Sequence, residues 1–166
     1  MNEQYAWLYE DPEDRIRAVD KLLGRPLALR KEISLKETKI RILREAAGRF
    51  EIRMHPDKVK STPDPTRIQD VLARVVDEER EIRRLEAEQA QAYLVSAGYI
   101  ADISHPLVQR VMELYYLEGR DVTHISADLG YSVSHLFRLR RRGLEEVEER
   151  LRGQAGMANS EFTIQK

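Results

Sequence analysis

Four arginines lie within five residues near the end of the chain, and they are the clearest candidates for binding chemistry. They are Arg138, Arg140, Arg141 and Arg142, and the segment 132–135, with two serines and a histidine, comes shortly before them. Guanidinium groups bind phosphates and the edge of guanine, and hydroxyl groups form hydrogen bonds with base edges. The chain as a whole has 28 Lys and Arg against 29 Asp and Glu, so this positive charge is local. The cluster predicts a surface that binds nucleic acid.

The residues before the arginines have the pattern of a helix-turn-helix. A short helix is expected over 122–129, and Gly130 can adopt the left-handed conformation that ends it. Ser132 can then cap the next helix, while Ile125, Leu129 and Leu136 form a small core between the two helices. A helix placed in this way reads the major groove from its first turns. The predicted DNA contacts are Ser132, Val133, Ser134, His135, Arg138, Arg141 and Arg142.

An ordinary solvated helix face is the plain alternative for these arginines. Glutamates follow them at Glu145, Glu146, Glu148 and Glu149, so ion pairs four residues apart are expected on such a face. We favour DNA binding because the turn, the caps, the core spacing and the basic face all agree.

Two long stretches upstream have apolar residues at alternating steps of three and four, the heptad spacing of helices that pack lengthwise. They predict helices over 27–50 and 66–97, with turn-forming residues at 52–65 between them. Two long helices of this kind joined by one loop favour an antiparallel, coiled-coil-like hairpin. Each apolar seam is narrow, and Lys36 takes one of its places, so a partner helix from a second copy is expected, with a homodimer favoured.

These elements predict an all-α protein in which a long antiparallel helical hairpin is followed by a C-terminal helix-turn-helix. The expected divisions are an N-terminal arm and short helix (1–26), the hairpin (27–103), the helix-turn-helix domain (104–152) and a disordered tail (153–166). Gly24, Arg25 and Pro26 are expected to end the first helix. Ser104 is expected to cap the first helix of the C-terminal domain. Trp7 is expected to pack the N-terminal arm.

The C-terminal part of the chain resembles region 4 of sigma-70-type factors through the segments YYLEGR (115–120), ISADLGYS (125–132) and LFRL (136–139). With the upstream segments LREAA (43–47) and VVDEEREI (75–82), the chain more closely resembles phage transcriptional regulators of the ArpU/RinA type. That resemblance implies a regulator of late or packaging genes of a phage or prophage. It also implies that the protein binds promoter DNA and has host RNA polymerase as a partner.

Three other functions fit parts of the pattern. A small terminase subunit also joins a helix-turn-helix to a helical oligomerisation region, but it recognises a packaging site. An adaptor would use the same helices to bind an acidic protein. The tripeptide His55-Pro56-Asp57 matches the loop motif of J-domain co-chaperones. The rest of that pattern is missing, so we interpret the match as chance.

Composition argues against several classes of activity. The chain has no cysteine, which excludes disulfides, thiol catalysis and cysteine-based metal sites. Its four histidines lie apart, and none has a second ligand at metal-binding spacing. We therefore expect no enzyme activity, cofactor or metal. No apolar run is long enough for a membrane span, and the expected location is the cytoplasm.

Overall fold

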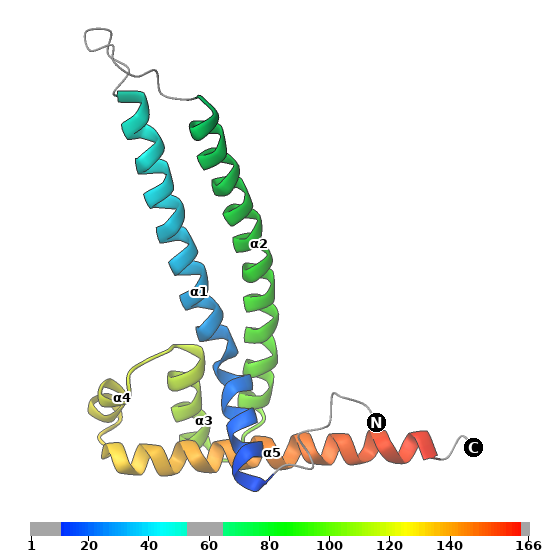
Figure 1. The fold of residues 1–166 in the computed structure, drawn as a ribbon. Coiled ribbons are helices and arrows are strands. Elements are labelled where there is room, and N and C mark those ends of the chain that lie inside the picture. Colours follow the sequence, from blue (N-terminus) through cyan, green and yellow to red (C-terminus); the bar gives the residue numbers. More distant parts are fainter. Residues whose placement is uncertain (1–10, 53–64, 164–166) are drawn as a thin grey trace. The chain divides into compact units, whose positions relative to one another are not determined.

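The computed structural model describes residues 11–52 and 65–163, and the regular elements in both ranges are helices (Figure 1). They are α1 (Pro12–Ile52), α2 (Pro65–Ala101), α3 (Pro106–Met112), a π-helical turn η2 (Glu113–Leu117), α4 (Val122–Leu129) and α5 (Val133–Thr163). The predictions of an all-α fold and of a long packed helix pair are confirmed. Trp7 and the tripeptide at His55 lie outside the described residues. In the described ranges, no helix is both long and apolar enough to cross a membrane.

Helix α1 continues through Pro26, so the predicted helix end at that residue is wrong. Proline inside a helix costs about 3 kcal/mol because it lacks an N–H and crowds the preceding turn. Here the buried positions follow one another without a break in helical spacing through Val19, Leu23, Pro26, Leu29 and Ile33. Burial of that continuous seam offsets the cost, and local propensity gave no indication of it.

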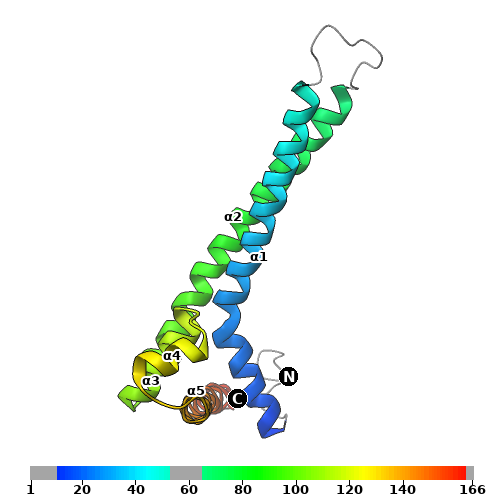
Figure 2. The same ribbon diagram turned by 90° about the vertical axis from the view of Figure 1, so that its left-hand side faces the viewer.

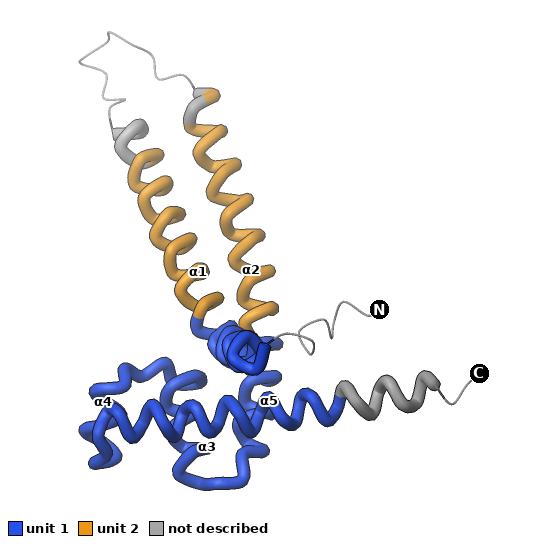
Figure 3. The backbone as a smooth tube through the Cα atoms, turned by 60° about the horizontal axis from the view of Figure 1, so that its bottom comes forward, with its two compact units in different colours: residues 1–27, 91–166 blue, residues 28–90 orange. Residues whose placement is uncertain are grey.

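The chain divides into two compact units, coloured separately in Figure 3. One unit comprises residues 1–27 and 91–166, and the other comprises residues 28–90. The sequence predicts a C-terminal domain that starts at residue 104. The structure adds to it the start of α1 and the end of α2, because their apolar faces pack in the same core.

The unit of residues 28–90 is the helical hairpin, in which α1 and α2 run side by side (Figures 1 and 2). In the described part of this unit, the buried apolar residues are Leu29, Ile33 and Ile40 of α1 and Val75 and Leu85 of α2. Lys36, which interrupts the apolar seam, is half-buried, and its Nζ lies 2.9 Å from Oε2 of Glu78. The ion pair explains how a lysine is accommodated at this position.

The other unit has a larger core to which every one of its helices contributes. The fully buried residues include Leu23 of α1, Ile100 of α2, Met112 of α3, Ile125 of α4 and Leu136 of α5. This core holds the segment that carries the four arginines.

Two predicted boundaries in this unit are wrong. The N-cap of α3 is His105, whose Nδ1 accepts from the backbone N–H of Leu107, and Ser104 instead donates to Glu146 from α5. The predicted disordered tail from Gly153 is helical as far as Thr163. Glycine costs only about 1 kcal/mol in a helix interior, so Gly153 and Gly156 do not end α5.

Candidate nucleic-acid interface

The joint between α4 and α5 is fixed by caps on both of its sides. Asp121 begins α4 by accepting from the backbone N–H of Thr123 at 2.8 Å. Gly130 ends it with φ 71° and ψ 22°, and its N–H donates to the carbonyl of Ser126. Ser132 begins α5, where its Oγ accepts from the N–H of His135 at 3.3 Å. The predicted roles of Gly130 and Ser132 are confirmed, whereas the cap at Asp121 was not predicted.

Replacing Gly130 with alanine is expected to lower the free energy of unfolding by about 1 kcal/mol, because a residue with a Cβ is strained in the left-handed region. A Cβ at this position would meet no other atom within 4 Å, so the backbone conformation alone sets the cost. Gly98 provides a matched control, since it lies inside α2 with the same open surroundings. Gly98→Ala should stabilise the protein by up to about 1 kcal/mol. Chemical denaturation of both variants measures the two changes in the free energy of unfolding. Changes of the same sign would contradict this account.

Packing below the joint fixes the orientation of α5. Ile125 and Leu136 are each 1% exposed, and Leu129 packs against the same core, as the sequence predicts. Further along α5, Gly143 is buried and lies close to α3, where a Cβ would come within 2.8 Å of the Met112 side chain. The absence of a side chain at Gly143 therefore permits the close approach of α5 to α3.

Three of the predicted contact residues share an exposed face of α5. Ser134, Arg138 and Arg142 are exposed and follow one another at steps of four, which places them on one side of the helix. Among the described residues, Arg138 and Arg142 have no carboxylate within ion-pair distance. Ser132 is also exposed, whereas Val133 and His135 are half-buried. The His135 ring packs against Tyr131, with ring centroids 5.1 Å apart.

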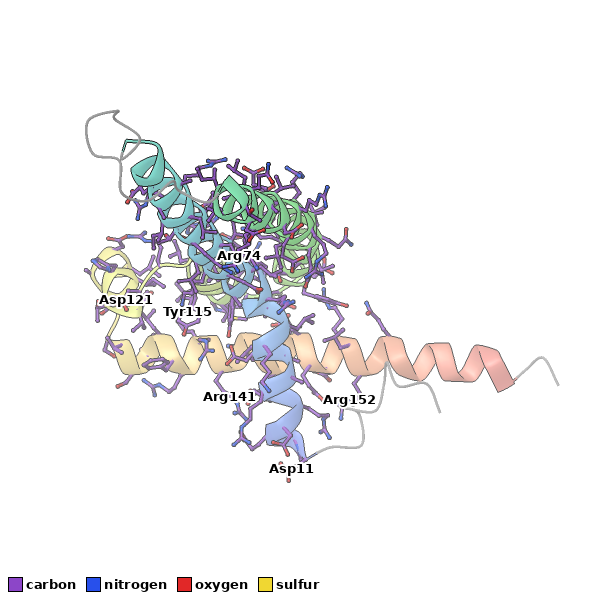
Figure 4. All side chains as sticks on the ribbon, turned by 45° about the horizontal axis from the view of Figure 1, so that its top comes forward. Asp11, Arg74, Tyr115, Asp121, Arg141 and Arg152 are labelled. Carbon is purple, nitrogen blue, oxygen red and sulfur yellow. The ribbon has the colours of Figure 1, made fainter. Side chains whose placement is uncertain are left out.

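Arg141 is engaged in ion pairs on the side of α5 that faces α1 (Figure 4). Its two Nη atoms lie 2.7 and 2.9 Å from the carboxylate of Glu13, and its Nε lies 2.8 Å from Glu145. The pair with Glu145 has the spacing of the solvated-face alternative. Arg141 therefore differs from Arg138 and Arg142, because its guanidinium already has carboxylate partners.

Arg140 points into the fold and forms part of a polar cluster with Asp20 and Tyr116. Its Nε donates to the Tyr116 hydroxyl at 2.8 Å, and its Nη2 pairs with Asp20, to which Tyr116 also donates. The guanidinium carbon also lies 4.5 Å from the centre of the Tyr115 ring. Burial opposes the charged form of Arg140, but Tyr116 and Asp20 more than compensate, so its pKa is raised. We interpret Arg140 as a structural residue that joins α1, η2 and α5.

Within the described part of the chain, no group of three or more His, Asp or Glu side chains is arranged to hold a metal ion. No protein family model, curated protein or solved structure matches this chain.

Proposed function

We propose that α4 and α5 form a helix-turn-helix and that the protein is a sequence-specific regulator of transcription that binds double-stranded DNA. The observation that carries this proposal is the exposed face formed by Ser134, Arg138 and Arg142. It lies directly after a joint with caps on both sides, and among the described residues its arginines have no carboxylate within ion-pair distance. The nearest acidic influence is Glu146, whose pKa is lowered first by its hydrogen bond with Ser104 and further by the charge of Arg142. Such a face leaves charge and hydrogen-bond donors available to a polyanion.

The position of each side chain along α5 suggests its role on DNA. Ser132 and Ser134 lie in the first turn, the part of a recognition helix that reaches base edges in the major groove. Arg138 is one turn further on and suits either a guanine or a phosphate. Arg142 lies another turn away and suits a phosphate. The exposed side of His135 adds a further polar contact, and half-buried Val133 adds an apolar contact, for example to a thymine methyl group.

The biological context of the proposal comes from the resemblance to phage regulators. In that context the DNA is the promoter of late or packaging genes, and host RNA polymerase is a partner. Each phosphate contact adds about 0.9 to the slope of log affinity against log salt. A few arginines therefore give only modest affinity. Two copies of the chain would join two such weak sites, which fits a homodimer on spaced half-sites.

Selection of bound fragments from phage and host genomes tests the proposal. The wild type is expected to enrich one or a few upstream regions, and the double variant R138A/R142A is expected to lose that enrichment. With each arginine on a phosphate, the double variant should also reduce the slope of log affinity against log salt by about 1.8.

The matched control is R74A/R83A, which removes two exposed arginines from α2. Its net charge therefore equals that of R138A/R142A. It is expected to bind like the wild type. Equal loss in both double variants would show attraction through overall charge, which contradicts sequence-specific reading by α5. A wild type that enriches nothing would contradict DNA binding itself. Enrichment at a packaging site, together with a ring-sized native mass, would favour the small terminase alternative.

A further inference from the structure

A small pocket lies between the first turns of α1 and the exposed start of α5, both within one compact unit. Its volume is about 180 Å³, and Ile16, Phe137 and Leu144 supply its apolar lining. Phe137 is 46% exposed, although most of the other exposed positions nearby on α5 are polar or charged. An exposed aromatic ring in a concave site is a typical anchor point for another apolar group.

Arginine side chains surround the apolar part of this pocket. Arg17, Arg140 and Arg141 line it, against two acidic residues, Glu13 and Asp20. All three arginines already have carboxylate partners: Arg141 pairs with Glu13 and Glu145, Arg140 with Asp20, and Arg17 with Asp14. Guanidinium groups also stack on aromatic rings, so the surroundings favour an aromatic group.

We propose that the pocket binds the chain's own N-terminal segment, residues 1–10, through the side chain of Trp7. This segment has the sequence MNEQYAWLYE, which contains two glutamates, no lysine or arginine, and the aromatic residues Tyr5, Trp7 and Tyr9. Its aromatic side chains suit the pocket, because an indole can contact the apolar lining and lie beside the guanidinium groups.

The length of the connection allows this docking. The residues of α1 that line the pocket run from Glu13 to Asp20, and at 1.5 Å per residue they span about 10 Å of helix. Trp7 is four residues before Asp11, so an extended connection reaches about 13 Å. A segment attached at this distance has an effective local concentration in the millimolar range, which an untethered partner would not have. The tether thus favours the chain's own segment over a separate peptide.

Trp7 is the only tryptophan of the chain, so its fluorescence reports directly on this segment. In the full-length protein, Trp7 is expected to emit at shorter wavelength, and to be quenched less by iodide, than in a peptide of residues 1–10. Phe137→Ala should move both properties towards those of the peptide. Because Phe137 is partly exposed, the variant should keep the fold, which far-ultraviolet circular dichroism checks.

Tyr131→Ala serves as the matched control, because Tyr131 is also an exposed aromatic residue of this region but does not line the pocket. It should leave Trp7 emission unchanged. Wild-type emission and quenching equal to those of the peptide would overturn the proposal. So would shielding of Trp7 that Phe137→Ala leaves intact, since another site would then hold it. Shielding that disappears on dilution would identify a second copy as the source of the segment, which also contradicts the proposal.

Discussion

Replacing Gly143 with leucine is expected to destabilise the protein by about 1–3 kcal/mol, since overpacking forces neighbouring groups out of their favoured positions. Gly143 is buried where α5 passes α3, and a Cβ there would lie 2.8 Å from both Cγ and Sδ of Met112. Met112 is itself fully buried, so it can give way only by displacing other side chains of the core. Thermal or chemical unfolding measures the loss.

A double-mutant cycle separates this clash from other effects of the substitution. Met112→Ala alone is expected to cost about 2–5 kcal/mol because it leaves a cavity. In the double variant the leucine at position 143 fills part of that cavity, so its cost should be smaller than the sum of the single costs by about 0.5–3 kcal/mol. Strict additivity would show that Gly143 and Met112 do not limit the approach of α5 to α3.

Tyr116→Phe is expected to lower the free energy of unfolding by about 1–3 kcal/mol, the usual contribution of hydrogen bonds to charged groups. Tyr116 is 2% exposed, and its hydroxyl donates to Asp20 and accepts from Arg140. The substitution keeps the ring and removes both hydrogen bonds. Tyr115→Phe is the matched control, since it makes the same chemical change next to Tyr116 and retains the ring that packs against Arg140. A similar loss in both variants would contradict a specific role for the Tyr116 hydroxyl.

The same hydroxyl gives the stability an expected dependence on alkaline pH. Burial, followed by the hydrogen bond to Asp20, raises the pKa of Tyr116 well above its ordinary value. The unfolded chain loses this proton near pH 10, whereas the folded chain keeps it. The contribution of Tyr116 is therefore complete below about pH 10 and decreases as the pH rises further. The free energy of unfolding, measured from pH 9 to 11, should decline more steeply with pH for the wild type than for Tyr116→Phe.

Local signals in the sequence predicted the parts of the fold that depend on neighbouring residues. Gly130 and Ser132 could be assigned as caps because each acts within a few positions of itself. The burial of Ile125 and Leu136 followed from helical spacing, as did the hairpin seam. The same local signals predict Ser104 as the cap of α3. Its hydroxyl and backbone N–H instead donate to Glu146, which is distant in the chain.

Features that depend on distant residues could not be predicted. Arg140 and Arg141 look equivalent to Arg138 and Arg142 in the sequence. Their partners Asp20 and Glu13 lie 120 and 128 residues away, and no periodicity indicates such pairs. Proline at position 26 gave a strong local signal for a helix end, yet the continuous seam through α1 overrides it. These tertiary contacts separate Arg140 and Arg141, which have carboxylate partners, from Arg138 and Arg142, which have none within ion-pair distance among the described residues.

The participation of the first turns of α1 in the core beside α5 has a consequence for biosynthesis. Arg15 and its partner Glu148 are separated by 133 positions, which a ribosome adding about 5–20 residues per second covers in about 7–27 s. During that interval Ile16, Val19 and Leu23 have been translated, but the apolar residues of α5 that share their core have not. The hairpin residues all emerge earlier and can pair first. The nascent chain thus exposes an apolar stripe that a chaperone could bind until α5 has been made.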